Sequence, residues 1–371
     1  MRLAITGDIF IHATAAGCEH PGHLAVLEFL RRSDHRIGNL DLTITDRGYP
    51  SPKPDIYRAL PSVADEIARL RFDLVSLANT HSTDFGADGL WRTMTLLERA
   101  GVRSVGAGLS MQAAFEPVIL ASHDLRVAII AAVVELPGQA STTLAAGLHS
   151  PGVALIPNYA VTQWQPGQPP RESFAPGTQE VRALISALTV ARQTADVVIF
   201  LLHAHWPPPL KTFEAGYILP HLAIDHGADL VVAHGSHLIE AVEAYRGRLI
   251  VHGIGNLFFQ LPTPDLYGFL PETSRALGRV WSNEALWHGL VAELELSATG
   301  PPGLRLLPVS MSREAPVGWP QLAEGEARAR IIDALQTSSA GDSVLFGDDG
   351  LTVSVSSPNK WLKPGVERSG V

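Results

Sequence analysis

Cysteine is almost absent from this chain, because its 371 residues include only Cys18. A single thiol cannot form a disulfide within the chain, and it excludes zinc or iron–sulfur sites built from several cysteines. Basic residues are also few, since 28 Lys and Arg stand against 37 Asp and Glu, for a net charge of -9. This balance argues against nucleic acid as a partner.

Long apolar runs are missing as well. No uncharged stretch reaches the roughly 18 apolar residues that a membrane-spanning helix needs. The first predicted strand starts at residue 2 or 3, which leaves no room for a signal peptide before it. We therefore expect a cytoplasmic protein without a membrane anchor. The hydrophobic content of 46% suffices for a large core, and we expect one domain over residues 1–355, followed by a tail over residues 356–371.

Apolar runs of strand length alternate with amphipathic patterns of helical period along most of the chain. The predicted strands cover residues 3–6, 36–40, 73–78, 117–121, 126–133, 195–202, 229–233, 244–245, 249–252, 290–296, 304–310 and 351–355. The predicted helices cover residues 21–32, 61–70, 86–100, 178–193, 213–226 and 321–335. Short polar turns join 117–121 to 126–133 and 244–245 to 249–252, which predicts two hairpins. Helices mixed with hairpins predict an α/β fold with a mixed sheet, or two packed sheets.

Two segments interrupt this alternation. Residues 137–177 are rich in proline and glycine and show little periodicity, so we expect a structureless, lid-like insertion. Residues 260–283 carry Tyr267, Phe269 and Trp281 and are expected to form an aromatic loop.

Side chains that bind metals follow five of the apolar runs. Loops that leave the carboxyl ends of strands converge at one edge of an α/β sheet, so these side chains should meet there. Aspartate oxygens and neutral imidazole nitrogens are good ligands for one or two ions of Mn, Zn or Fe. The predicted metal ligands are Asp8, Asp41, His203, His205, His234 and His237.

Bound metal lowers the pKa of a coordinated water and polarises a carbonyl or phosphoryl oxygen. His81 is suited to protonate the leaving group, and Asp84 to orient that histidine. Further contacts to metal or substrate are expected from Asn39, Asn79, Thr80 and Asn256.

Ordinary structural roles compete with these assignments. Asp8 and Asp41 could cap turns, and His81 could be a satisfied core histidine. Asn79 could make a structural hydrogen bond to the backbone, and Asn256 could occupy a tight turn with positive φ.

Several short motifs occur together in one order. They are Gly7-Asp8, Asn39-Leu40-Asp41, Asn79-Thr80-His81 with Asp84-Phe85-Gly86, Gly106-Ala107-Gly108, Leu202-His203, His234-Gly235-Ser236-His237, Val242–Gly247 and Gly255–Phe259. In these motifs the chain resembles the CapA family of poly-γ-glutamate capsule synthesis proteins, a branch of the calcineurin-like metallophosphoesterase superfamily. The resemblance covers roughly residues 1–300.

This resemblance implies a four-layer α/β/β/α sandwich of two mixed sheets, with a site for two divalent metals at the sheet edge. It also implies that Asp8, Asp41, His203, His234 and His237 are ligands and that His81 is the general acid. Three positions depart from the family pattern. Thr80 replaces an asparagine ligand, Phe10 replaces a histidine of the superfamily, and His205 is an added candidate. These departures fit a centre with a single metal. They equally fit a centre with one strong and one weak metal site, in which His205 or His12 compensates for the lost ligand.

We therefore predict a soluble metal-dependent hydrolase in which a metal-bound hydroxide attacks an amide of γ-glutamyl type or a phosphoester. The core motifs contain no lysine or arginine to bind phosphate, which favours the amide. Two alternatives stay open: a non-catalytic accessory protein of poly-γ-glutamate capsule synthesis, or a biosynthetic tailoring enzyme with the same metal centre. The expected partner is a small-molecule or γ-glutamyl peptide-like substrate, and a homodimer is left open.

Overall fold

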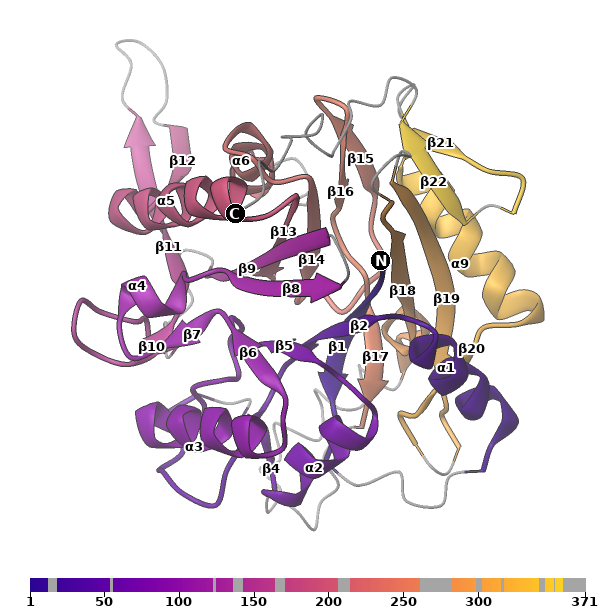
Figure 1. Cartoon of the computed structure of the whole chain (residues 1–371), viewed down its shortest axis with the longest axis horizontal. Coiled ribbons are helices and arrows are strands. Elements are labelled where there is room, and N and C mark those ends of the chain that lie inside the picture. Colours follow the sequence, from indigo (N-terminus) through magenta and orange to yellow (C-terminus); the bar gives the residue numbers. More distant parts are fainter. Residues whose placement is uncertain are drawn as a thin grey trace, which may run out of the picture.

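Two large mixed sheets form the body of the molecule in the computed structural model (Figure 1). The structure describes residues 1–12, 19–53, 56–122, 125–135, 143–163, 171–205, 214–260, 282–297, 302–314, 317–339, 344–349 and 351–355. In spatial order, the main path of the ten-stranded sheet is β21 (Val344–Phe346), β22 (Thr352–Val355), β19 (Gly303–Met311), β18 (His288–Glu295), β1 (Arg2–Phe10), β2 (His35–Leu40), β5 (Leu74–Ser76) and β6 (Arg103–Val105). Beside this path, β17 (Asn256–Phe259) pairs with β1, and β20 (Pro320–Leu322) pairs with β19.

The second sheet has eight strands. Its path is β12 (Arg171–Pro176), β11 (Leu155–Gln163), β9 (Leu125–Glu135), β13 (Val197–Ala204), β14 (Leu230–His234), β16 (Arg248–Val251) and β15 (Val242–Tyr245), with β8 (Val118–Ser122) paired to β9. The central strands β9, β13, β14 and β16 are parallel, whereas β8 and β15 pair antiparallel. Two small pairs are β3 (Thr43–Ile44) with β4 (Arg58–Ala59) and β7 (Ala107–Gly108) with β10 (Gly152–Val153).

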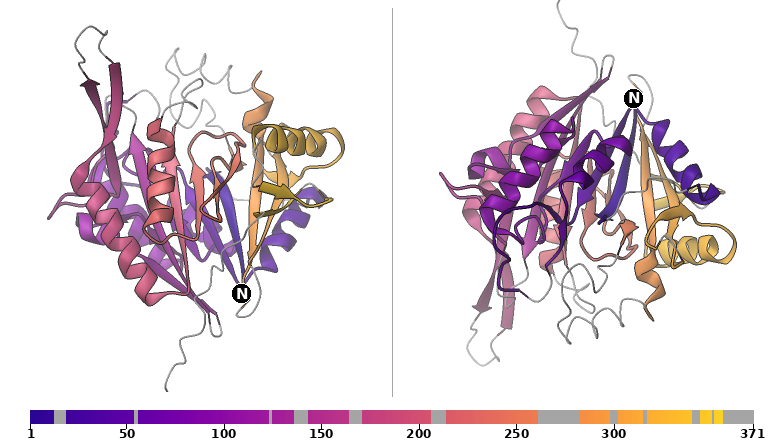
Figure 2. Two further views of the ribbon diagram at one scale, coloured as in Figure 1. Left: turned by 90° about the horizontal axis from the view of Figure 1, so that it is seen from above. Right: turned by 90° about the horizontal axis from the view of Figure 1, so that it is seen from below.

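Helices cover the sheets from outside. They are α1 (Pro21–Arg31), α2 (Ser62–Arg69), α3 (Gly86–Arg99), α4 (Met111–Ala114), α5 (Thr178–Thr194), α6 (Glu214–Asp225) and α9 (Gly325–Ser338), with the short 3-10 helix η2 (Glu284–Trp287). Figure 2 shows the strands in the middle, with α5 and α6 on one side and α1 and α9 on the other.

Strand β9 illustrates why the central strands appear as unbroken apolar runs. Ile129 belongs to a buried cluster that also contains Ile5 of the first sheet, so one face of β9 is turned to that sheet. Its neighbour Ile130 belongs to a second cluster with Leu184 of α5. Because both faces of the strand are covered, both sets of alternating side chains must be apolar. The predicted α/β class with mixed sheets is confirmed, and so are the two hairpins, β8–β9 and β15–β16.

Two expectations about local structure were wrong. The segment 137–177 is not structureless in its described part, because it contains β10, β11 and β12. The first residues of β11 pair with β9, and the remainder forms a hairpin with β12. Pro157 within β11 and the lack of alternation concealed this strand from pattern analysis. The helix expected from residue 321 starts only at Gly325, because residues 320–322 pair with β19.

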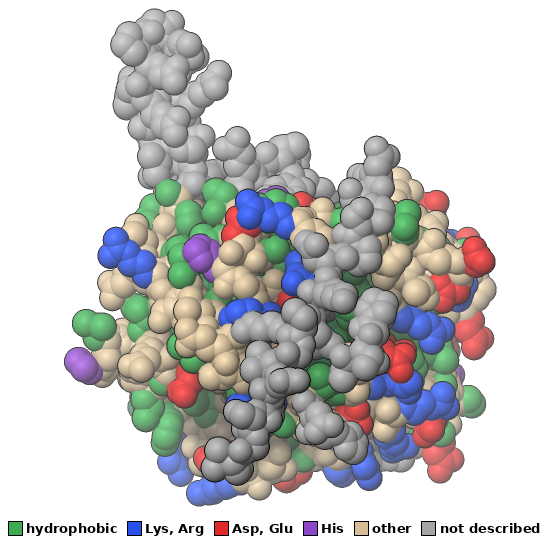
Figure 3. All heavy atoms as spheres, turned by 45° about the horizontal axis from the view of Figure 1, so that its top comes forward, with side chains coloured by type: hydrophobic (Ala, Val, Ile, Leu, Met, Phe, Trp, Pro, Cys, Tyr) green, Lys and Arg blue, Asp and Glu red, His purple; other side chains and the backbone are tan. Residues whose placement is uncertain are grey.

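Several predictions concern residues outside the described part of the chain. These are Cys18, residues 261–281 of the expected aromatic loop, parts of the 137–177 insertion, and the tail 356–371. The lid-like role of the insertion and the single-domain limits stay predictions. In the described part of the chain, no helix combines the length and apolarity required to cross a membrane. Figure 3 shows acidic and basic side chains interspersed among the described residues of one face.

Candidate metal centre

The candidate centre lies where strands of both sheets end. Asp41 directly follows β2, and His234 is the last residue of β14. His203 lies near the end of β13, in register with His234. Asp8 lies within β1, and not after it as expected, at a point where the pairing of β1 with its neighbours changes register. The two sheets therefore bring side chains that can bind a metal to one place, the seam where the sheets meet.

A close approach of two backbone segments fixes the position of Asp8. A Cβ atom on Gly7 would lie 2.2 Å from the carbonyl oxygen of Gly255, which no side chain could tolerate. The backbone N–H of Asp8 donates to that same carbonyl at 3.0 Å. Gly255 has φ +68°, a conformation that suits glycine. The Gly-Asp motif is therefore a steric requirement of this crossing.

The Asp8 carboxylate is completely buried and is held by three donors. Asn39 Nδ2 donates to Oδ1 at 2.8 Å, while His237 Nδ1 and the backbone N–H of Gly235 lie 2.9 and 3.2 Å from Oδ2. Burial by itself would raise the pKa of Asp8. The hydrogen bond from His237 and the positive charge of that ring outweigh this effect and lower the pKa. Asp8 is therefore ionised at neutral pH.

Asp41 is the most unusual group of the centre. It is completely buried, and neither of its carboxylate oxygens has a hydrogen-bond partner among the described residues. Burial raises the pKa of Asp41 to about 7, with the charge of Asp8 adding to the effect and His81 opposing it. Ligand atoms of Asp8, Asp41 and His203 all lie within 4.8 Å of one another. A buried carboxylate without partners costs several kcal/mol unless a positive charge compensates it.

Two histidines of β13 and its continuation point their nitrogens to one place. The Nε2 atoms of His203 and His205 lie 3.1 Å apart, and Thr80 Oγ1 lies 3.3 Å from His205 Nε2. Burial lowers the pKa of both rings, well below the usual value for His203 and to about 3 for His205. Both imidazoles are therefore neutral at pH 7, which is the state that binds metals.

His234 and His237, the last pair of candidate ligands in the sequence, make different contacts. His234 Nε2 donates to the carbonyl oxygen of Thr6 at 3.0 Å, which fixes its ring. His237 Nδ1 lies between Asp8 and Asn256, with its distance to Asn256 Oδ1 at 3.0 Å. Burial would lower the pKa of His237, but Asp8 raises it to about 9. His237 has φ +57°, a strained backbone of the kind found at functional sites.

His81, Asp84 and Lys53 form a second group next to these ligands. His81 Nδ1 donates to Asp84 Oδ2 at 2.9 Å, as expected for an oriented histidine. Lys53 Nζ lies 2.5 Å from Asp84 Oδ1, donates to the Thr80 carbonyl at 2.7 Å and lies 3.3 Å from His81 Nδ1. Sequence analysis missed Lys53, because it belongs to a loop with no apolar run or motif around it.

The two asparagines of the candidate set act within the scaffold. Asn39 Nδ2 donates to Asp8 and lies 3.1 Å from His203 Nδ1, so it joins the two sheets. Asn79 Nδ2 donates to the carbonyl of Leu40, and its Oδ1 accepts from the backbone of His81. The structural alternative for Asn79 therefore describes its contacts.

Phe10 and Asn256 complete the surroundings. The Phe10 ring packs edge-on against Tyr57, His81 and His237, at centroid distances of 4.9, 5.8 and 5.5 Å. Asn256 is the first residue of β17 and has no positive φ, which belongs to the preceding Gly255. The interpretation of Asn256 as a turn residue was wrong. Sequence analysis also offered His12 as a residue that could compensate for a weak metal site. Its Nδ1 lies 3.0 Å from the Arg58 carbonyl.

All the predicted site residues thus come together. Contacts or close ligand atoms join Asp8, Asn39, Asp41, Asn79, Thr80, His81, Asp84, His203, His205, His237 and Asn256. His234 lies opposite His203 on the neighbouring strand. The carboxylates of Asp8 and Asp41 and the neutral imidazoles of His203 and His205 form a donor set suited to Mn, Zn or Fe, and His237 would join it on losing its proton.

The chain was compared with family models, with curated proteins and with solved structures. Residues 2–261 match the family model of the bacterial capsule synthesis protein PGA_cap. An uncharacterized protein of Sinorhizobium fredii, y4sH, is 24% identical over 91% of this chain and 89% of its own length. A probable polyglutamine synthesis accessory protein of Mycobacterium tuberculosis is 32% identical over 63% of this chain and 57% of its own.

Two further comparisons reach other relatives. The PGA biosynthesis protein CapA of Bacillus subtilis is 24% identical over 62% of this chain and 54% of its own. Among solved structures, a hypothetical protein from Thermus thermophilus aligns over 83% of this chain and 98% of its own, at 16% identity and a TM-score of 0.45.

Proposed function

Since the chain belongs to the PGA_cap family of bacterial capsule synthesis proteins, we propose that it is a metal-dependent hydrolase. Its substrate would carry a γ-glutamyl amide or a phosphoester. The proposal includes the calcineurin-like, four-layer form of the α/β fold.

The state of Asp41 carries this proposal. A carboxylate that is fully buried without a hydrogen bond is rarely retained in a protein, because its desolvation is not compensated. A divalent cation between Asp41, Asp8 and His203 would compensate it, since their ligand atoms already lie within 4.8 Å of one another.

Six side chains would hold one or two ions. They are Asp8, Asp41, His203, His205, His234 and His237. When bound, such an ion would polarise a carbonyl or phosphoryl oxygen and make a coordinated water more acidic. Asn39 keeps Asp8 and His203 in place by contacting both.

His81 would deliver a proton to the leaving group. Its Nδ1 is engaged with Asp84, so Nε2 is the atom that can transfer the proton. Lys53 balances the charge of Asp84 and is already bound to it and to the Thr80 carbonyl. A lysine with these contacts is poorly placed to bind a phosphate as well. This favours an amide substrate over a phosphoester.

A second function is supported by the names of the relatives. The Mycobacterium tuberculosis protein is called a polyglutamine synthesis accessory protein, and the Bacillus subtilis protein is named for biosynthesis. A non-catalytic accessory role in capsule polymer synthesis would agree with these names. Thr80, a weaker ligand than an amide, is the residue that fits a lost activity.

Metal content measured together with hydrolysis separates the two functions. We would compare wild type with His234→Ala, which removes a buried imidazole, and with His226→Ala, which removes an exposed one. Metal is measured by elemental analysis, and turnover with γ-glutamyl p-nitroanilide and p-nitrophenyl phosphate.

The hydrolase proposal expects stoichiometric transition metal and anilide turnover in wild type and His226→Ala. Both should fall at least about tenfold in His234→Ala. Wild-type protein that takes up no metal and hydrolyses neither compound would refute the proposal and favour the accessory role.

A further inference from the structure

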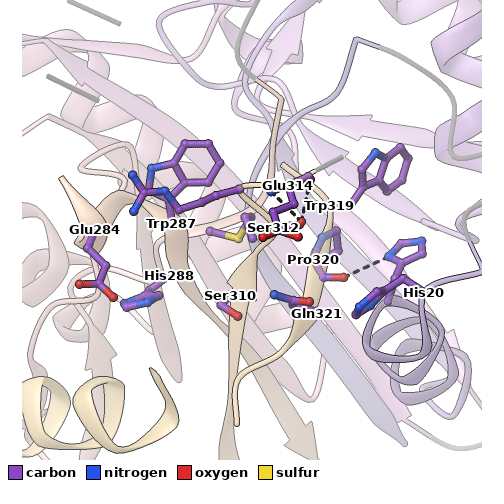
Figure 4. A pocket seen from close by; sticks show the side chains of 13 residues that line it. His20, Glu284, Trp287, His288, Ser310, Ser312, Glu314, Trp319, Pro320 and Gln321 are labelled. Atoms are coloured by element: carbon purple, nitrogen blue, oxygen red, sulfur yellow. Dashed lines mark hydrogen bonds between the residues drawn. The ribbon is translucent and has the colours of Figure 1, made fainter. Parts of the chain in front are cut away.

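A series of aromatic contacts leads from a cavity outside the metal centre to His81. The cavity, of about 370 Å³, lies between η2, β19, β20 and the start of α1, and Figure 4 shows the indole of Trp287 at one side of it. That indole is only 1% exposed, and its ring lies 5.5 Å from the Phe259 ring. Phe259 lies 6.0 Å from Phe10, and Phe10 lies 4.9 Å from Tyr57. The cavity wall is thus one end of an aromatic cluster whose other end is Tyr57.

Tyr57 contacts both members of the pair formed by His81 and Asp84. Its ring lies edge-on to the His81 ring, with centroids 4.5 Å apart and an angle of 79° between the planes. Its backbone N–H donates to Asp84 Oδ2 at 2.6 Å, the same oxygen that accepts from His81 Nδ1. Phe10 adds a second edge-on contact to His81 at 5.8 Å. The His81 ring is therefore held by one hydrogen bond and by two aromatic rings in a favourable geometry.

Thr43 in β3 ties the backbones of Tyr57 and His81 together. It is completely buried. Its N–H donates to the Tyr57 carbonyl at 3.1 Å, and its hydroxyl donates to the His81 carbonyl at 2.7 Å. Because one residue holds both backbones, the Tyr57 ring cannot move far from His81 without the loss of a buried hydrogen bond.

From these contacts we infer that Tyr57 and Thr43 are positioning residues, which hold the His81 ring in the orientation that proton transfer to the leaving group requires. This inference rests on the proposed hydrolase function. Both residues act through His81, and neither needs to touch the substrate or the metal. Proton transfer by a general acid depends on its geometry, so a small rotation of the ring lowers the rate.

Two pairs of substitutions separate this role from general packing. Tyr57→Leu removes the ring and Tyr57→Phe keeps it, while Thr43→Val removes the hydroxyl at similar size. The matched controls are Tyr49→Leu, which changes a tyrosine that is 90% exposed, and Thr45→Val, which changes a buried threonine whose hydroxyl donates to the Arg47 carbonyl.

Two substrates with the same acyl group show whether the effect passes through His81. The amine of γ-glutamyl p-nitroanilide must be protonated to leave, whereas the phenolate of γ-glutamyl p-nitrophenyl ester leaves without a proton. Metal content is measured in parallel by elemental analysis.

We expect kcat for the anilide to fall about fivefold to tenfold in Tyr57→Leu and Thr43→Val, at unchanged KM and metal content. The ester should be affected much less, and Tyr57→Phe and both controls should resemble wild type. In a His81→Ala background, Tyr57→Leu should have no further effect. The inference is overturned if Tyr57→Leu slows both substrates equally, raises KM alone, or lowers kcat further in the absence of His81.

A measurement without turnover separates this inference from the proposed function. Exchange of the imidazole C2 hydrogen, followed by mass spectrometry, reports the surroundings of His81 whether or not the protein is active. Exchange at His81 should become at least about threefold faster in Tyr57→Leu and stay unchanged at the exposed His149. Wild type that hydrolyses neither compound refutes the hydrolase, on which this inference rests. An active wild type with an unchanged exchange rate at His81 in Tyr57→Leu refutes the positioning role alone.

Discussion

Replacing Asp41 by Asn should stabilise the protein when metal is removed. The carboxylate has an ordinary pKa of 3.8 and a pKa of about 7 in the folded chain. Because each tenfold change in proton affinity is worth about 1.4 kcal/mol, the ionised form destabilises folding by about 4 kcal/mol. An amide that leaves its own hydrogen bonds unmade would cost about 1–3 kcal/mol. Asp41→Asn should therefore gain about 1–3 kcal/mol at about pH 8.

The sign of the pH dependence follows from the direction of the pKa. Asp41 binds its proton more tightly in the folded chain than in the unfolded one, so its contribution falls as pH rises from about 4 through 7. Asp41→Asn does not titrate and should lack this loss. Urea unfolding followed by circular dichroism, with EDTA at about pH 5 and about pH 8, measures the difference between the two proteins.

Added metal should reverse the order of stability. Mn²⁺ at about a thousand times its Kd stabilises wild type by about 4.1 kcal/mol, more than the advantage of Asp41→Asn, whereas Asp41→Asn should gain much less. Asp229→Asn is the matched control, because Asp229 is equally buried but pairs with Arg192 at 2.5 Å and Arg248 at 3.2 Å. It should respond to Mn²⁺ as wild type does. The reasoning fails if Asp41→Asn is less stable than wild type in EDTA at the higher pH.

Three further experiments, with four substitutions, test other parts of the centre. His205→Ala should weaken Mn²⁺ binding about tenfold or more by calorimetry, and Thr80→Asn in that background should recover part of it, because the residue 80 side chain reaches the same nitrogen at 3.3 Å. His81→Ala should lower kcat about 10²–10⁴-fold at unchanged metal content, with a smaller loss for leaving groups that need no proton. Gly7→Ala should displace Asp8 and abolish metal uptake, because its Cβ would lie 2.2 Å from a carbonyl oxygen. Equal metal content in Gly7→Ala and wild type would contradict the steric argument.

The parts of the fold that sequence analysis could predict are those decided by local pattern. Strands β9 and β13 are apolar along their whole length because both of their faces are buried, and such runs are easy to recognise. Strand β17 is short, begins with a polar residue after a glycine and depends on pairing with β1 at the other end of the chain. Strand β11 contains Pro157 and has no alternation. Neither strand has a local signal, so tertiary pairing alone reveals them.

Some features of the candidate site could likewise be predicted from the sequence, and others are visible only in the structure. The residue types of Asp41 and His203 at strand ends indicated ligands, and the chain brings them together as expected. That both Asp41 oxygens lack partners is visible only in three dimensions. Lys53 could not be predicted, because its contact with Asp84 arises from a loop that folds back over the centre. The contacts of Asn79 likewise depend on where Leu40 lies.

The seam between the sheets has a consequence for how the molecule holds together. Asn39 joins Asp8 of one sheet to His203 of the other, across 164 positions of sequence. An ion shared by these side chains would add a cross-link between two sheets that are already joined by apolar packing and by hydrogen bonds such as that from Gly235 to Asp8. Loading with metal would then slow the parting of the sheets, and amide hydrogens of β1 and β13 would exchange in step. Binding of the metal would then both complete the proposed active site and stabilise the contact between the two sheets.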